Sequence, residues 1–259
     1  MVLSVAKSLL KVLKIFFVTL LFWFVNISLV IFYWLVLSVS LIFVFSKRTR
    51  ISLYQKAAKS WGKILSAIAA PRMSVMGLEN IPKDKPVIYT PNHQGNLDWM
   101  ILLAILPLPF RFVIKKELFK IPLFGNIIKG AGYFSLDREA KRKAYDTLVN
   151  VIEIARKESV VIFPEGTRTW DGKVGEFKRG GFLLAFEVGN PIIPVAISGS
   201  FDIMPRYTWI IKPGEVRVKI GPPISLEEFR EERGINYRKA IEKVRGVVET
   251  MLSEIEHKH

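Results

Sequence analysis

The sequence predicts an α/β fold, with a mixed, largely parallel sheet flanked by helices and an N-terminal hydrophobic, membrane-associated helical segment. Two patterns lead to this prediction. From residue 74 onward, short runs rich in Val, Ile, Phe and Tyr alternate with longer helical stretches, which is typical of sheets covered by helices on both faces. Before them, the run 15–46 contains no charged side chain, no glycine and no proline.

The N-terminal run is too long for one upright membrane span. At about 1.5 Å per residue its helix would measure roughly 48 Å, against a hydrocarbon core of about 30 Å. A single tilted span fits, as does a bent pair of shorter helices that enters and leaves on the same side. Basic residues flank both ends, and positive flanks stay cytoplasmic, which favours a bend near Asn26 or Ser28. A buried hairpin of a soluble core is the third alternative, although such helices normally keep a polar stripe.

The next segment, 51–73, is amphipathic and basic. It fits a helix lying on a membrane surface, and it fits an ordinary surface helix packed on the domain equally well. We therefore expect membrane-anchoring helices over 1–73 and a globular domain over 74–259. The expected location is a cell membrane, with the active site on its cytoplasmic face.

The globular part is predicted to contain seven strands, at 74–78, 86–90, 111–114, 133–136, 160–163, 192–199 and 216–220. Helical stretches lie between and after them, near 97–106, 122–129, 139–158, 180–188 and 236–256. In sheets of this class, ligands bind outside the carboxyl ends of the strands. The turns that follow residues 90, 136 and 163 are therefore the first places to look for a site.

Composition limits the chemistry of that site. The 259 residues include no cysteine, which excludes disulfides, thiolate metal sites and a cysteine nucleophile. Only three histidines are present, two of them among the last three residues, so no metal site is predicted. A formal net charge of +15 indicates an anionic partner, which composition alone leaves open between nucleic acid, a membrane surface and a small substrate.

The turn after the strand at 86–90 carries a histidine and a carboxylate. His93 and Asp98 are five residues apart, and five steps along a continuous helix turn by about 500°, so the two would not share a face. They meet only if His93 lies on the strand-to-helix turn and Asp98 in the first helical turn, with Gly95 and Asn96 between them. A histidine held in this way by a carboxylate suits a general base. Taken alone, the pair also fits a capping contact without chemistry.

The strand at 160–163 is followed directly by Glu165, Gly166, Thr167 and Arg168. Glycine lets backbone N–H groups approach an anion, threonine donates a hydroxyl, and arginine offers a bidentate fork. This combination predicts a phosphate pocket, although a turn with a solvated arginine fits it too.

Further cations follow two more strands. Lys115 and Lys116 come after 111–114, and Arg138 comes after 133–136. Each is an ordinary surface charge when considered by itself. Their convergence on the edge that carries His93 is the stronger indication of a site.

Four blocks, in order and spacing, resemble those of the 1-acylglycerol-3-phosphate acyltransferase family of glycerolipid acyltransferases. They are NHQGNLD, KKELFKIPLFGNIIKGAGYFSLDR, FPEGTR and PIIPVAISG, within about residues 74–225. The chain departs at Thr169, where many members have serine, and both residues offer a hydroxyl. Its short length resembles the bacterial members.

The resemblance implies transfer of a fatty acyl group from a thioester to the 2-hydroxyl of lysophosphatidic acid, which gives phosphatidic acid. It implies His93 as the base and Asp98 as the residue that orients it. It also implies a glycerol-phosphate site formed by Glu165, Gly166, Thr167, Arg168, Arg138 and Lys115 or Lys116. No cofactor is implied, and the acyl donor is a thioester of acyl-carrier protein or coenzyme A. The expected partners are these substrates and membrane lipids, without nucleic acid.

Two other readings remain open: acylation of glycerol 3-phosphate or another lysolipid, and a non-catalytic membrane lipid-binding protein. The chemistry favours an enzyme, since a hydroxyl must lose its proton as it attacks a thioester and a positioned base contributes about 10²–10⁴-fold. We expect oxyanion donors in the turn around Gly95 and the helix start that follows it. We expect an acyl groove to involve 99–110 and 121–128.

Overall fold

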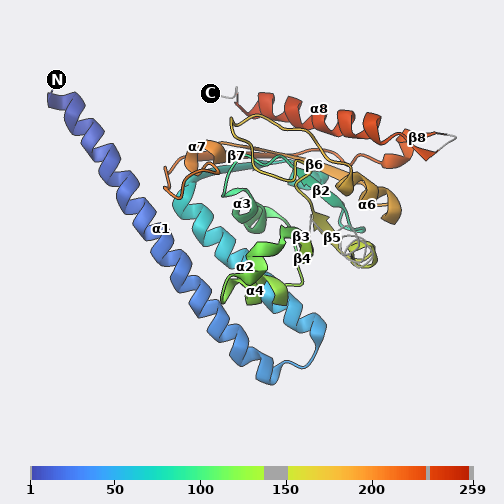
Figure 1. Cartoon of the computed structure of the whole chain (residues 1–259), viewed down its shortest axis with the longest axis horizontal. Helices are drawn as coiled ribbons and strands as arrows, with labels where there is room; N and C mark the ends of the chain where they lie inside the picture. Colours follow the sequence, from blue (N-terminus) through green and yellow to red (C-terminus); the bar gives the residue numbers. More distant parts are fainter. Residues whose placement is uncertain (1, 137–150, 232–233, 257–259) are drawn as a thin grey trace.

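The computed structural model describes residues 2–136, 151–231 and 234–256, and a central sheet with helices on both faces dominates it (Figure 1). The helices are α1 (Val2–Phe43), α2 (Lys47–Ala69), α3 (Asp98–Ile105), α4 (Phe124–Gly130), α6 (Gly180–Val188), α7 (Ser200–Ile203) and α8 (Tyr237–Glu256). The strands of the sheet are β1 (Arg72–Met76), β2 (Ile88–Pro91), β3 (Phe110–Lys115), β4 (Phe134–Leu136), β5 (Ser159–Val161), β6 (Ile192–Ser198) and β7 (Glu215–Ile220). A short hairpin, β8 (Arg230–Glu231) and β9 (Gly234–Ile235), precedes α8.

The seven strands are arranged in the order β1-β7-β6-β2-β5-β3-β4. All neighbours are parallel except β6 and β7, so β6, β2, β5, β3 and β4 run in one direction. The carboxyl ends of these five strands therefore share one edge of the sheet. This confirms the predicted mixed, largely parallel sheet, and each of the seven predicted strands is present.

The two faces of the sheet bury two separate apolar cores. Along β6, Ile193, Val195 and Ile197 contribute to the core shared with α2 and α3. The alternate residues Ile192 and Ala196 contribute to the core beneath α6 and α8. This period of two is what a strand buried on both faces requires. Figure 1 shows α8 over one face of the sheet and α2 and α3 over the other.

Helix α2 is packed on the globular part, which matches the second of the two interpretations of 51–73. Its Gly62 lies against α3, where a Cβ would be 2.6 Å from the Cβ of Leu103 and 2.8 Å from the carbonyl oxygen of Met100. Only glycine therefore permits this close approach of the two helices. The predicted helices at 97–106, 122–129, 180–188 and 236–256 are confirmed, whereas 139–158 lies partly outside the described residues, with 151–155 helical.

Helix α1 is one continuous helix, so the predicted bend near Asn26 or Ser28 is wrong. Asn26 accepts a hydrogen bond from the indole Nε1 of Trp61 on α2 at 3.1 Å. The polar side chain of Asn26 therefore links α1 to α2 and does not mark a kink in α1. The chain turns back only after α1, at residues 44–46, where the Arg50 guanidinium donates to the carbonyl of Leu41 at 3.2 Å and to that of Val44. Helices α1 and α2 thus form a hairpin that turns at residues 44–46. An unbroken α1 remains compatible with the other alternative, a single tilted span.

Most of α1 faces outward. Within the described residues, α1 is the one helix long and apolar enough to cross a membrane, and its most apolar stretch is only 6% buried. Phe22 and Leu37 are buried, while Phe17, Phe24 and many other large apolar side chains of α1 are exposed. Such exposure does not fit the third alternative, a buried hairpin of a soluble core.

Candidate active site

Three polar side chains meet where the parallel strands β2, β5 and β6 end. His93 follows β2, Glu165 follows β5, and Ser200 follows β6 as the first residue of α7. These strands are neighbours in the sheet, so the side chains that follow them lie at one edge. This is the edge that the sequence predicted for the site.

His93 and Asp98 are in direct contact. The Nδ1 of His93 lies 2.7 Å from Oδ2 of Asp98, which is the first residue of α3. His93 lies on the preceding turn, so the expected geometry of the pair is confirmed. The Asp98 side chain is fully buried, whereas that of His93 is 17% exposed. Because Asp98 holds Nδ1, Nε2 is the ring nitrogen left for a substrate.

The Asp98 carboxylate accepts two further hydrogen bonds. The Gly95 N–H donates to Oδ2 at 3.0 Å, and the fully buried Ser200 hydroxyl donates to Oδ1. A Cβ at Gly95 would lie 2.5 Å from the carbonyl oxygen of Ser200, so this turn needs glycine to approach α7. Both oxygens of Asp98 are thus held from outside its own helix, which fixes the orientation of the carboxylate toward His93.

Two of the expected oxyanion donors, both in the turn around Gly95, are already engaged. The Gly95 N–H is bonded to Asp98, and the Asn96 N–H donates to the carbonyl of Met204 at 2.8 Å. The expectation that these two amides face an oxyanion is therefore wrong. The Gly95 N–H is taken up by the first residue of α3, and the Asn96 N–H by the residue that follows α7. The donors expected at the start of α3 stay a prediction.

Glu165 lies behind His93. Its Oε1 accepts the backbone N–H of His93 at 2.7 Å, and its Oε2 accepts the N–H of Gly175 at 2.9 Å. Burial raises the pKa of this carboxyl to about 7, although the two N–H groups act in the opposite direction, and the charge of Asp98 adds to the rise. Glu165 therefore ties the loop after β5 to the His93 turn.

The imidazole of His93 is also held from one side of its ring. Phe163 stacks against it, with ring centroids 3.9 Å apart and planes 23° apart. Asn92, the residue before His93, extends the pairing of β2 with β6. Its Nδ2 donates to the Ile197 carbonyl at 2.9 Å, and its Oδ1 accepts the Ile197 N–H at 2.7 Å. The turn that carries His93 is thus rigidly attached to the sheet.

Cations lie beside this buried pair. Arg168 is half-buried, and burial together with the nearby Arg206 lowers its pKa, while Asp98 raises it. In the described part of the chain, no carboxylate forms a salt bridge with Arg168. Arg206 donates to the Arg168 carbonyl at 2.8 Å, and its guanidinium lies 3.8 Å from the ring centroid of Trp170. Two arginines this close, neither in a salt bridge within the described residues, are a candidate site for an anion.

The remaining residues predicted for the site are spread more widely. Gly166 has φ +70°, and Lys178 reaches it, because a Cβ at Gly166 would lie 3.3 Å from Nζ. Thr167 is exposed. Lys115 ends β3, is exposed and lies 3.6 Å from Glu117, and Lys116 is the next residue, also exposed. Arg138 lies outside the described residues.

Strand order sets how far the lysines lie from the base. Strand β5 separates β3 from β2, so the backbone of Lys115 lies about 10 Å from the strand that precedes His93, a distance that a lysine side chain partly spans.

Residues 2–136, 151–231 and 234–256 contain no group of three or more histidine, aspartate or glutamate side chains that could hold a metal ion.

Sequence reasoning missed Ser200, Arg206 and Lys178. Ser200 directly follows a predicted strand, so the rule that found His93 and Glu165 could have found it. Arg206 and Lys178 carried no such signal, because each lies several residues beyond a strand and reaches the site through the path of a loop.

The comparisons with known proteins agree with this geometry. A family model described as Acyltransferase matches residues 72–198. The chain is 32% identical over 180 residues to the 1-acyl-sn-glycerol-3-phosphate acyltransferase of Pseudomonas aeruginosa, covering 67% of this chain and 69% of that protein. This chain belongs to the 1-acyl-sn-glycerol-3-phosphate acyltransferase family.

Two further relatives extend the comparison. The crystal structure of PlsC, the 1-acyl-sn-glycerophosphate acyltransferase of Thermotoga maritima, matches with a TM-score of 0.82 and 27% identity, covering 96% of this chain and 99% of that one. The chloroplastic acyltransferase BAT2 of Brassica napus is 38% identical over 180 residues, or 68% of this chain. The chain matches about half of the length of this plant relative, 52%. The family's sequence blocks therefore occur here on the same fold as in the bacterial member.

Proposed function

We propose that this chain transfers a fatty acyl group from a thioester to the 2-hydroxyl of lysophosphatidic acid and releases phosphatidic acid. One observation carries the proposal: an arginine without a carboxylate partner in the described part of the chain lies beside a histidine that a buried aspartate holds. An anion bound by Arg168 would be placed next to His93. Lysophosphatidic acid carries its phosphate and its free hydroxyl on one short glycerol unit, so it fits both groups at once.

His93 acts as the general base in this proposal. As the hydroxyl oxygen attacks the thioester carbonyl, its proton moves to Nε2, and Asp98 stabilises the imidazolium that forms. The carbon–sulfur bond then breaks, and the thiol leaves with a proton. A thiolate is a good leaving group, so no covalent acyl-enzyme is needed, and the chain has no cysteine to carry one.

Arg168 and Arg206 bind the phosphate, with Lys178, Gly166 and Thr167 at the same turn. Lys115, Lys116 and Arg138 remain proposed contributors from neighbouring strand ends. Holding the phosphate makes attack by the hydroxyl effectively intramolecular, which can supply several kcal/mol of the barrier. We assign Glu165 a positioning role instead of a phosphate contact, because both of its oxygens accept backbone N–H groups.

A narrow apolar cavity of about 20 Å³ lies between the helices, and we propose that they move apart there to admit the acyl chain of a substrate. Its lining includes Trp99 and Leu103 of α3 and Phe124 and Ile127 of α4, which belong to the two segments proposed for the groove. Helix α1 closes the cavity with Tyr33 among other residues. A chain entering here would pass beside the helix that we place in the membrane.

We also propose that the α1–α2 hairpin rests in the cytoplasmic leaflet of a cell membrane. Basic residues occur near the start of α1 and again at its turn into α2, at Lys47, Arg48 and Arg50. Charges at both ends of α1 remain near headgroups, so the exposed apolar face of the helix lies along one leaflet. In vesicles with the cytoplasmic face inward, an impermeant thiol reagent added outside should not label Ser4→Cys or Ser28→Cys. Labelling at either position would contradict this arrangement.

The proposed activity is tested by an acceptor panel. The purified full chain in bilayers receives either acyl-carrier protein or coenzyme A thioester, with lysophosphatidic acid, glycerol 3-phosphate or lysophosphatidylcholine, and products are identified by mass spectrometry. We expect phosphatidic acid from lysophosphatidic acid with at least one donor. Preferential acylation of glycerol 3-phosphate, or binding of lysophosphatidic acid without turnover by either donor, would contradict the proposal.

A further inference from the structure

The loop between α7 and β7 exposes several large side chains to solvent. Tyr207 is 64% exposed, Trp209 is 65% exposed and Ile210 is 49% exposed. Trp170, on the loop that follows Arg168, is 67% exposed. We call these four residues the aromatic collar, because Arg206, which precedes Tyr207, stacks on Trp170 and so joins the two loops.

The collar borders both the candidate active site and α1. Toward the site, the Asn96 side chain donates to the carbonyls of Pro205 at 2.9 Å and Thr208 at 3.2 Å. Toward α1, the indole Nε1 of Trp23 donates to the Trp209 carbonyl at 2.9 Å, and the two indole rings lie 5.6 Å apart. Figure 1 shows this orange loop close to α1.

Hydrogen bonds hold the loop in place on both sides of Trp209. The Ile211 N–H donates to the hydroxyl of Thr19 on α1 at 3.0 Å. Ile211 itself is buried, whereas its neighbours Ile210 and Trp209 are exposed. The collar is thus a fixed continuation of the exposed apolar surface of α1. Its rings contact Arg206, Trp23 and Phe201 on one side and remain about two-thirds exposed.

The residue types of the aromatic collar indicate what kind of partner it contacts. Trp and Tyr pair a large apolar ring with a polar N–H or O–H group, which favours the boundary between hydrocarbon and headgroups. The loop from 204 to 214 carries Arg206 and Lys212 and no acidic residue. On the other loop, Trp170 is followed by the exposed Asp171 and Lys173, whose charges balance. A surface that is aromatic and basic complements an anionic lipid bilayer.

We propose that the aromatic collar is a second membrane contact, which inserts into the headgroup region of an anionic bilayer and holds the mouth of the active site against it. This inference rests on the proposed position of α1 in the membrane. Helix α1 supplies attachment, and the collar fixes the rotation and depth of the domain. An acceptor lipid would then reach Arg168 from the leaflet without leaving its headgroup layer.

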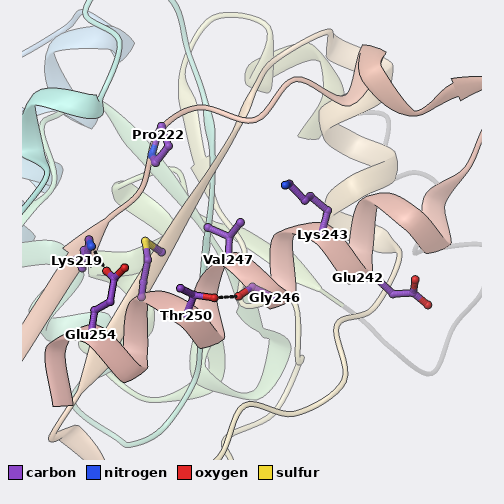
Figure 2. Close-up of a pocket in the computed structure, with 9 residues that line it drawn as sticks. Lys219, Pro222, Glu242, Lys243, Gly246, Val247, Thr250 and Glu254 are labelled. Carbon is purple, nitrogen blue, oxygen red and sulfur yellow. Dashed lines mark hydrogen bonds and ion pairs between the residues drawn. The ribbon is translucent and has the colours of Figure 1, made fainter. Parts of the chain in front are cut away.

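A groove on another face provides the matched control. It has a volume of about 460 Å³ and runs along α8, between Lys219 and Lys243 (Figure 2). Lys219 pairs with Glu254 across it, and none of its lining residues belongs to the candidate site or the collar. Lys243 is exposed, so a label there reports a surface that should remain in water.

The test uses single cysteines, which have no background in this Cys-free chain. Tyr207→Cys and Ile210→Cys report the collar, Phe17→Cys reports α1, and Lys243→Cys reports α8. Each full-length variant is labelled with a polarity-sensitive fluorophore and placed in vesicles of phosphatidylglycerol and brominated phosphatidylcholine. We expect quenching by the brominated lipid at 207, 210 and 17, and none at 243.

The outcomes separate this inference from the function on which it rests. Quenching at 17 with both collar positions as unquenched as 243 would overturn the collar and leave the anchor standing. No quenching at any position would overturn the proposed anchoring as well. Protection of 207 and 210 by acyl-carrier protein, but not by lipid, would overturn the membrane contact in favour of a carrier-docking surface.

A kinetic readout completes the test. The Tyr207→Ser/Ile210→Ser variant should lower kcat/KM for bilayer-embedded lysophosphatidic acid by about fivefold, because apolar side chains no longer enter the interface. With a short-chain acceptor dispersed in water, kcat/KM should stay unchanged. An equal loss with both acceptors would indicate a folding defect and contradict the collar.

Discussion

The two halves of the candidate site are built in opposite ways. In the half that holds the base, His93, Asp98, Glu165 and Ser200 are largely buried, and each carboxylate oxygen accepts a hydrogen bond from the protein. In the half that holds cations, Arg168 is half-buried beside Arg206, and neither has a carboxylate partner among the residues that the structure describes. The first half is held by contacts within the protein, whereas the second half offers charged donors to a ligand.

This difference assigns different kinetic roles. Side chains that are already fixed by the protein stabilise the transition state without being reorganised, so their loss should reduce turnover. Cations without a counter-ion gain their partner when substrate binds, so their loss should weaken binding. Substitutions of His93, Arg168 and Ser200 test that division through kcat and KM, and a substitution of Glu165 tests the burial of the first half.

Replacing His93 by alanine should lower kcat by about 100-fold or more, because the attacking hydroxyl loses its base. The KM for lysophosphatidic acid should change little, since the cations remain. Steady-state kinetics in bilayers measure both quantities, and the thermal unfolding temperature of the variant checks that it is folded. Near-normal turnover by a folded variant would remove His93 from the chemistry.

Glu165→Gln should change how stability depends on pH. With its pKa raised from 4.5 to about 7, Glu165 keeps its proton in the folded chain at pH values where the unfolded chain has lost it. Its contribution to stability is therefore fully present below pH 4.5 and is lost as the pH rises through about 7, at a cost of about 3 kcal/mol.

The glutamine variant has no proton to lose, so its unfolding temperature should fall less than that of the parent chain between about pH 5 and pH 8. Thermal unfolding of the detergent-solubilised full chain measures this difference. Glu176→Gln, on the same loop but exposed, is the matched control and should behave like the parent. An identical fall in the parent and Glu165→Gln would contradict the buried, protonated carboxyl.

Arg168→Ala should raise the KM for lysophosphatidic acid by about 30-fold, a typical loss for a charge-assisted contact to phosphate. A smaller fall in kcat would accompany it if the phosphate contact also sets the direction of attack. Lys173→Ala removes an exposed positive charge from the same loop and should leave KM nearly unchanged. Equal effects of both substitutions would mean that the loop acts only through its overall charge.

Ser200→Ala should have the smallest effect, a fall in kcat of about fivefold with unchanged KM, because Asp98 keeps its bonds to His93 and Gly95 and loses one donor. Ser198→Ala, two residues earlier at the end of β6, is the control and should leave kcat unaltered. If Ser200→Ala raises KM without affecting kcat, Ser200 acts on binding and the division between the halves fails at this residue.

The sequence predicted the half that holds the base more completely than the half that holds cations. His93, Asp98 and Glu165 lie within a few residues of strand ends, so strand alternation and the parallel-sheet rule placed them correctly at one edge. The role of Glu165 was less accessible, because its partners are the backbone N–H groups of His93 and Gly175. Backbone donors carry no residue-type signal, so only the path of the chain shows them.

The N-terminal prediction failed in a different way. Asn26 was one of two positions expected at a bend, because it is among the most polar residues of the apolar run. In the structure its partner is Trp61 on α2, and α1 remains straight enough to pack along that helix. Long-range pairing of this kind cannot be read from the spacing of residues within one segment.

The measurement that tests direct transfer to a bound acceptor most simply is a single-turnover experiment with labelled donor. The purified full chain in bilayers is mixed in excess over an acyl thioester that carries a radiolabelled acyl group, with and without lysophosphatidic acid, and is quenched at short times. With acceptor present, all the transferred label should appear in phosphatidic acid, and no label should become attached to the protein in either case. A protein-bound acyl group that forms without acceptor and then passes to lysophosphatidic acid would contradict the role of His93 as a base for direct attack.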